Sequence, residues 1–171
     1  MITGKMQEAL NKQVNAEFYS AYLYLAMSAW FDSIDMPGAA NWMRIQYTEE
    51  IIHAEKIFDY IKERDGRVIL QAIENPPLKW ESALDAFKAA YNHEQKITAM
   101  ISELVDIARK ENDLATEVFL QWFVNEQVEE EASVKAIVQQ LKLIEGSQNG
   151  MFMIDRELAT RTKQSPSSKS Q

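Results

Sequence analysis

The chain has 171 residues, enough for one domain with a substantial core and too few for two comfortable ones. Its 18 basic and 26 acidic residues give a formal net charge of −8 with no marked Lys/Arg cluster, so we expect no nucleic-acid partner. Because Cys is absent, disulfides and thiolate metal sites are excluded.

Two observations bear on membranes and targeting. The N-terminal segment, residues 1–13, lacks the apolar core of a signal peptide. The longest apolar run, residues 21–31, is about half as long as a membrane span requires. We therefore expect a cytoplasmic protein that does not contact a membrane.

The chain is poor in helix breakers, with 5 Gly and 4 Pro, and this favours an all-α fold. Apolar residues at helical spacing predict a first helix, with Thr3 as its N-cap, that stops at the turn 32–38. A second helix is predicted from about residue 38 to 65, where Asp65 and Gly66 form a C-terminal signal.

The segment 66–81 has no helical period and contains two adjacent prolines. A third helix is predicted from Ser82 to the polar break 110–113, and a fourth from there to 145–150. If it is extended, the non-helical link is long enough to cross the length of a bundle. Its length alone does not exclude a link that returns without crossing.

A short amphipathic fifth helix is predicted at the C-terminal side, over residues 151–162. The domain is therefore expected to cover residues 1–162, and residues 163–171 are expected to form a disordered tail.

Polar residues interrupt the apolar face of each long helix near its middle. A carboxylate in such a place must be paired, protonated or bound to a metal, because a bare buried charge is too costly. Two of the helices carry their polar residues at i, i+3 spacing, so both side chains can reach the same centre. The interrupting residues are Glu17 in the first helix, Glu50 and His53 in the second, Glu94 in the third, and Gln127 and Glu130 in the fourth.

These residues are also matched in height along the bundle. Glu17 and Glu50 lie at nearly equal distances from the turn 32–38, and Glu94 and Glu130 from the break 110–113. In an antiparallel hairpin, residues equidistant from the turn face each other. The chain is thus expected to bring four carboxylates, one imidazole and one amide together at mid-height.

A pair of divalent cations would neutralise such a cluster. Oxygen-rich ligation with one imidazole suits iron or manganese better than a structural zinc site. Four-helix di-iron proteins use one Glu on each of two helices and Glu-x-x-His on the other two. The chain matches this pattern in three helices and departs from it in the fourth, which has Gln127 and Glu130.

Some nearby polar residues have ordinary interpretations. His93 lies off the face of Glu94 and is expected at the surface, and Glu131 can be neutralised by Lys135 one turn later. Tyr24 and Trp122, each taken alone, are typical packing residues. Packing does not explain the joint arrangement of the six interrupting residues.

The segments that carry these residues resemble the non-haem ferritins of bacteria and archaea. The matching segments are NAEFYSAYLYL around Glu17, EEIIHAE (49–55), YNHEQ around Glu94, and FLQWFVNEQVEEE (119–131). The resemblance covers residues 5–162. It implies a ferritin-like four-helix bundle with one long crossover loop and a short fifth C-terminal helix that packs around a symmetry axis.

The resemblance also implies a function. Such proteins form a hollow homo-oligomeric shell, typically a 24-mer, which oxidises Fe(II) with dioxygen or peroxide and stores the Fe(III) product as a mineral. The chain would then be an iron-storage protein with ferroxidase activity.

Residue roles follow from the same resemblance. Glu17, Glu50 and His53 would hold one iron, and Glu94 and Glu130 the other, with Glu50 bridging and Gln127 close by. A third, transient iron site would use Glu49, Glu126, Glu129 and Glu130. Tyr24 matches the tyrosine adjacent to the di-iron centre, and Trp122 is a second candidate electron donor.

Other readings of the sequence stay open. A bacterioferritin would carry a haem-ligating Met where Ile52 stands and a His where Glu130 stands, so no haem is expected. A rubrerythrin-like di-iron enzyme acting on peroxide or an organic substrate would lack its usual Cys site here. The remaining alternatives are a DNA-protecting mini-ferritin and an acidic bundle that binds no metal.

Overall fold

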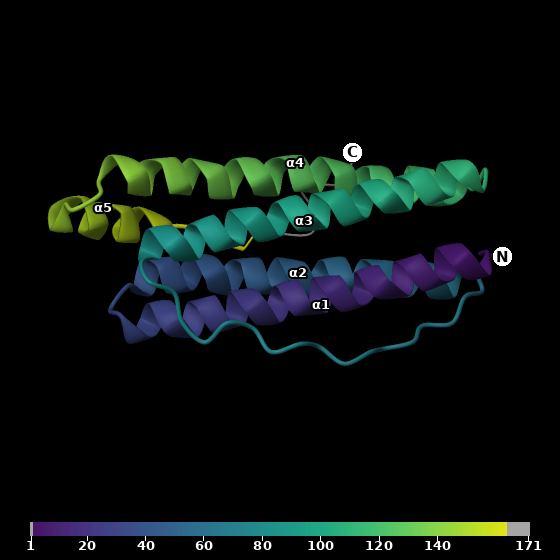
Figure 1. Cartoon of the computed structure of the whole chain (residues 1–171), viewed down its shortest axis with the longest axis horizontal. Helices are drawn as coiled ribbons and strands as arrows, with labels where there is room; N and C mark the ends of the chain where they lie inside the picture. The colour runs from purple at the N-terminus through teal and green to yellow at the C-terminus, as the bar shows by residue number, and fades with distance from the viewer. Residues whose placement is uncertain (1, 164–171) are drawn as a thin grey trace.

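The computed structural model of the chain describes residues 2–163, which form five α-helices (Figure 1). None of the helices in this range is both long and apolar enough to cross a membrane. The tail expected at 163–171 lies outside the described residues except for Lys163. The helices are α1 (Gly4–Ser33), α2 (Pro37–Glu63), α3 (Ala83–Lys110), α4 (Leu114–Leu143) and α5 (Gln148–Leu158).

Side-chain caps start most of the helices, and this confirms two predicted N-caps. The Thr3 hydroxyl accepts a hydrogen bond from the Met6 amide at 3.2 Å, and the Ser82 hydroxyl accepts one from the Asp85 amide at 3.1 Å. Such caps satisfy backbone donors that the first helical turn leaves unpaired.

The helix α5 begins and ends earlier than the predicted range 151–162. The Ser147 hydroxyl accepts a hydrogen bond from the Gly150 amide at 3.0 Å, and so caps a helix that starts at Gln148. This cap lies within the polar segment 145–150, which the apolar pattern assigned to a turn.

The first three helices end in turns that contain a residue in the left-handed region. Asp35, Asp65 and Asn112 have φ angles of 58°, 56° and 55°. Asp and Asn tolerate this conformation better than other residues with a side chain. The turns after α1 and α3 are short, so each pair α1–α2 and α3–α4 forms an antiparallel hairpin (Figure 1).

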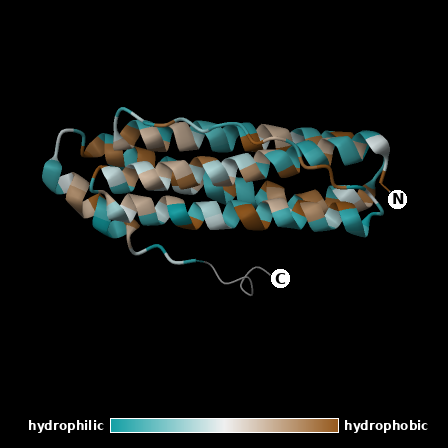
Figure 2. Ribbon diagram, turned by 90° about the horizontal axis from the view of Figure 1, so that it is seen from below, coloured by the Kyte–Doolittle hydropathy of each residue, from teal (hydrophilic) through white to brown (hydrophobic). Residues whose placement is uncertain are grey.

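The two hairpins are joined by a true crossover. Residues 64–82 run along the whole bundle, from the end where α2 stops to the opposite end where α3 begins (Figures 1 and 2). Polar side chains of α1 hold this segment: the Asn11 amide donates to the Arg67 carbonyl at 3.0 Å and accepts from the Ile69 amide at 2.6 Å. The crossing topology, which length alone left open, is thereby confirmed.

The apolar core is divided into two clusters. One includes Phe31, Met43 and Phe87, and the other includes Leu10, Ile61 and Leu120. Between them, at mid-height, each long helix contributes buried polar residues. We refer to Glu17, Glu50, His53, Glu94, Gln127 and Glu130 as the polar belt.

A close contact fixes α5 against the start of α2. The Asp155 carboxylate accepts hydrogen bonds from the Gly38 amide at 3.1 Å and the Ala39 amide at 2.9 Å. The N-cap residue of α2, Met36, makes no side-chain hydrogen bond, so the Asp155 carboxylate caps this helix instead. A negative charge at this place also complements the helix dipole. Ile154 and Leu158 are buried beneath the same contact.

Candidate metal centre

The polar belt brings all six predicted residues to one place in the bundle interior. None of them exposes more than 9% of its surface. They come from four helices, with one residue from α1, two from α2, one from α3 and two from α4. The prediction that these residues meet at mid-height, which was made from their distances to the two turns, is thus confirmed.

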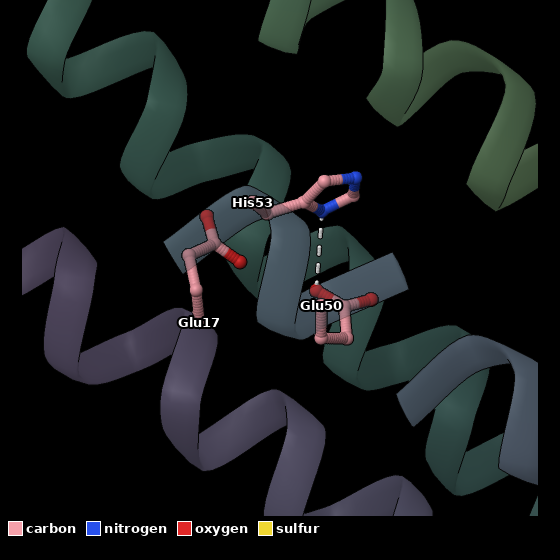
Figure 3. A group of neighbouring side chains, drawn as sticks. All are labelled: Glu17, Glu50 and His53. Carbon is pink, nitrogen blue, oxygen red and sulfur yellow. Dashed lines mark ion pairs between the residues drawn. The ribbon is translucent and has the colours of Figure 1, made fainter. Parts of the chain in front are cut away.

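One group of donors lies on the first hairpin. A ligand atom of each of Glu17, Glu50 and His53 lies within 4.8 Å of the others. The Nδ1 atom of His53 is 3.3 Å from Oε2 of Glu50 (Figure 3). In Figure 3 the side chain of Glu17 from α1 lies beside those of Glu50 and His53 from α2, and the dashed line joins His53 and Glu50.

A second group spans both hairpins. Carboxylate oxygens of Glu50, Glu94 and Glu130 also lie within 4.8 Å of one another. Glu50 therefore belongs to both groups. A carboxylate shared in this way can bridge two cations, since each of its oxygens has lone pairs for a separate ion.

Two buried oxygen atoms indicate what the centre accommodates. Within residues 2–163, Oε2 of Glu17 and Oε2 of Glu130 are buried and have no hydrogen-bond partner. Buried polar atoms are almost always satisfied, so each such atom needs an explanation. The two oxygens belong to residues of different donor groups. One cation in each group would satisfy both, and the oxygen-rich donor set with one imidazole suits iron or manganese.

Burial changes the protonation of these acids. Loss of solvation raises the pKa of Glu17 and Glu94, and raises the pKa of Glu50 and Glu130 well above the ordinary value. Neighbouring carboxylates raise the pKa of Glu50 and Glu130 further. Without cations the cluster thus retains protons, which bound metal would displace.

Tyr24 and Gln127 both act on Glu94. The Tyr24 hydroxyl donates a hydrogen bond to the Glu94 carboxylate. The Gln127 amide nitrogen donates to Oε2 of Glu94 at 3.1 Å and to its backbone carbonyl at 3.2 Å. Burial, followed by the charge of Glu94, raises the pKa of Tyr24 well above its usual value, so the phenol keeps its proton.

Of the four acids expected to form a third iron site, Glu130 belongs to the second donor group, whereas Glu49, Glu126 and Glu129 belong to neither group. Oε2 of Glu49 accepts a hydrogen bond from the Arg161 guanidinium at 2.6 Å. Glu126 is buried and Glu129 is exposed on α4. The third site stays a prediction.

Two expectations about neighbouring residues were wrong. His93 is half-buried rather than at the surface, and its Nε2 atom lies 2.7 Å from the Ser20 hydroxyl. Burial, aided by Lys96, lowers the pKa of His93 to about 4. Glu131 accepts a hydrogen bond from Thr98 at 2.6 Å, so its partner is on α3 and not one turn along its own helix.

Two buried glutamines were missing from the predicted site. The Gln13 amide donates to Oε1 of Glu17 at 2.7 Å, and the Gln46 amide donates to Oε1 of Glu50 at 3.1 Å. Each glutamine stands four residues before the acid that it contacts. A Gln one turn before a face-centred Glu is the sequence signal that identifies such supporting residues.

Comparison with known proteins places this geometry in context. The family model described as the ferritin-like domain matches residues 7–144. A non-heme ferritin of Bacteroides fragilis is 41% identical over 161 residues, covering 94% of this chain and 100% of the relative. One from Campylobacter jejuni is 40% identical over 156 residues, covering 91% and 93%.

Solved structures give the same picture. An open-pore ferritin from the hyperthermophilic archaeon Archaeoglobus fulgidus matches with a TM-score of 0.94 and 53% identity, over 95% of this chain and 100% of that chain. A form of that ferritin engineered to be closed matches with a TM-score of 0.94 and 52% identity, over 96% and 100%.

Proposed function

The chain belongs to the ferritin-like family, and from this premise we propose that it stores iron and oxidises Fe(II) at the polar belt. The observation that carries the proposal is the position of Glu50. Its carboxylate lies in both donor groups, and each group includes a residue with one buried carboxylate oxygen that has no partner within residues 2–163. Two Fe(II) ions, as substrates, would occupy these two groups.

The ligands divide between the two ions by their position. Glu17, Glu50 and His53 would hold one ion, and Glu94 and Glu130 the other, with Glu50 between them. Buried anionic oxygens interact more strongly with Fe(III) than with Fe(II), because Coulomb energy scales with the charge of the ion. The belt therefore favours loss of an electron from each ion.

The electron count of the reaction is set by the pair of ions. Two Fe(II) ions together release two electrons. Dioxygen accepts two electrons and two protons to give hydrogen peroxide, whereas hydrogen peroxide accepts the same number to give two molecules of water. Either oxidant fits a centre of two irons.

Storage requires an enclosed space. By its likeness to ferritins, the chain would assemble into a hollow homo-oligomeric shell in the cytoplasm, typically a 24-mer, and Fe(III) would mineralise inside it. Exposed apolar residues on α5 support contact between copies, since Phe152 and Met153 are 64% and 71% exposed.

The proposal is tested by comparing Glu94→Ala with Glu103→Ala, which removes an exposed carboxylate from the same helix. We expect Glu94→Ala to slow Fe(II) oxidation severely while gel filtration still shows the assembled shell. Glu103→Ala should oxidise Fe(II) at the wild-type rate. A wild-type rate in Glu94→Ala would refute the assignment of the site.

A further inference from the structure

Arg161 connects the segment after α5 to the middle of α2. This segment, in yellow at the end of the chain, runs back from α5 toward the centre of the bundle (Figure 1). The Arg161 guanidinium lies 4.3 Å from the Trp42 ring and donates to the Trp42 carbonyl at 3.3 Å. It also donates to Glu49 at 2.6 Å and to Oε1 of Gln46 at 3.0 Å.

The backbone of Arg161 also contacts α2. The Asn41 amide donates to the Arg161 carbonyl at 3.1 Å. Upstream, Leu158 is buried and Asp155 caps α2. Arg161 therefore approaches α2 from a fixed position.

Gln46, the residue that Arg161 contacts, touches two acids of the polar belt. Its side chain is nearly inaccessible, at 2% exposure. Its amide nitrogen donates to Oε1 of Glu50 at 3.1 Å and to Oε1 of Glu130 at 3.0 Å. One amide group thus holds a carboxylate from α2 and a carboxylate from α4.

The chemistry of the two side chains fixes the direction of the amide. A guanidinium has only donors, whereas a primary amide has donors at nitrogen and an acceptor at oxygen. Only the oxygen of Gln46 can face Arg161, so its nitrogen must face Glu50 and Glu130. If the amide turned over, its oxygen would face two carboxylates and repel both.

This orientation leaves the other carboxylate oxygens for cations. Oε2 of Glu130 has no hydrogen-bond partner within the described chain, and Oε2 of Glu50 lies 3.3 Å from His53 in the first donor group. Partners of this kind, which orient metal ligands without touching the metal, commonly change metal affinity by about 10–100-fold when they are removed.

We propose that Arg161 and Gln46 are positioning residues of the metal centre: Arg161 fixes the direction of the Gln46 amide, and Gln46 holds Glu50 and Glu130 in the geometry that binds two cations. The inference deepens the proposed function, because it assumes that the polar belt binds metal. It assigns a role in the centre to a residue outside the four-helix bundle.

Two simpler roles for Arg161 predict different results. If Arg161 only anchors the C-terminal segment, its loss lowers stability and leaves metal binding unchanged. If Arg161 only neutralises Glu49, its loss makes the site more negative and tightens cation binding. The positioning role alone predicts weaker binding.

The experiment measures Zn(II) binding by calorimetry in the assembled, metal-free protein for Arg161→Leu, Gln46→Leu and the double variant. We expect each single variant to weaken Zn(II) binding by about tenfold. Because Arg161 acts through Gln46, adding Arg161→Leu to Gln46→Leu should change the affinity by less than about twofold. Arg156→Leu, which removes an exposed charge from the neighbouring helix α5, is the control and should bind as wild type.

A conservative variant and a spectrum complete the test. Lys also has only donors but lacks the planar group that lies on Trp42, so Arg161→Lys should recover part of the lost affinity and covers the case in which Arg161→Leu fails to fold. The visible absorption of bound Co(II) should change in Arg161→Leu and not in Arg156→Leu. Wild-type or tighter Zn(II) binding in Arg161→Leu, or losses that add fully in the double variant, would overturn the proposal.

The outcome is separable from that of the proposed function. If the wild-type protein binds Zn(II) with the expected coupling but does not oxidise Fe(II), the ferroxidase proposal fails and the positioning role stands. If oxidation occurs and the coupling is absent, the positioning role fails alone.

Discussion

The hydroxyl of Tyr24 on α1 donates a hydrogen bond to the carboxylate of Glu94 on α3, and so ties the two hairpins together at the level of the polar belt. Both side chains are buried. If this phenol lost an electron, its proton would pass to an adjacent acceptor. The Glu94 carboxylate, which already accepts the hydrogen bond, is in place to receive that proton. Trp122 has a different setting, with Lys56 Nζ 4.6 Å from its ring centroid. That cation opposes removal of an electron from the indole.

We therefore expect Tyr24→Phe to slow Fe(II) oxidation by about tenfold, comparable to the loss of one hydrogen bond to a charged group. Trp122→Phe should have a smaller effect. Stopped-flow absorbance measures both rates, and Tyr22→Phe, an exposed position on the same helix, serves as the control. A larger loss in Trp122→Phe than in Tyr24→Phe would reverse the assignment of the electron donor.

The shared position of Glu50 gives a prediction about stoichiometry. Glu17→Ala should weaken one of two bound Zn(II) ions, whereas Glu50→Ala should weaken both, because only Glu50 belongs to both donor groups. Calorimetric titration separates the two cases, with the exposed Glu55→Ala as a control. Loss of a single ion in Glu50→Ala would show that this carboxylate does not bridge.

The raised pKa values of the buried acids predict how stability depends on pH in the metal-free protein. The folded state holds these protons more tightly than the unfolded state, where a Glu has a pKa of about 4.3. Their contribution to stability is therefore complete below that value and is lost as the pH rises through the folded-state pKa of each acid.

The melting temperature of the metal-free protein should consequently fall as the pH is raised above about 4.3, the unfolded-state value of a Glu. Glu50→Gln, which has no proton to lose, should show a shallower fall. Zn(II) should raise the melting temperature more at the higher pH, because it then replaces fewer protons. A metal-free wild type that became more stable over this range would contradict the assignment of these acids as protonated.

The contact between α2 and α5 can be tested at Gly38. A Cβ atom at this position would lie 1.7 Å from the backbone oxygen of Asp155. We expect Gly38→Ala to push α5 away and to cost about 1–3 kcal/mol, typical of overpacking, seen as a lower melting temperature. Gly4→Ala is the matched control, since nothing lies within 4 Å of a Cβ there. Equal melting curves for the two variants would show that α5 yields without strain.

Much of the site could be predicted because a short turn determines which residues of the two helices that it joins lie opposite each other. Once the turns at 32–38 and 110–113 are located, equal spacing places Glu17 opposite Glu50 and Glu94 opposite Glu130, and the structure brings all four together. Capping residues such as Thr3 and Ser82 define helix ends for a similarly local reason.

Long-range contacts were beyond this kind of prediction. Nothing local connects Arg161 to Gln46, because their contact depends on how α5 docks against α2. His93 was misplaced since the face angle of α3 alone does not reveal that Ser20 of α1 lies within reach. The direction of the crossover likewise depends on α1, whose Asn11 holds it along the bundle.

The division of the core has a mechanical consequence. Each of the two apolar clusters contains residues from all four long helices, so the four helices are packed together on both sides of the polar belt. If the polar belt binds ions as proposed, we expect its side chains to adjust to them while both clusters stay packed. Binding and release of ions at mid-height would then not require either end of the bundle to unpack.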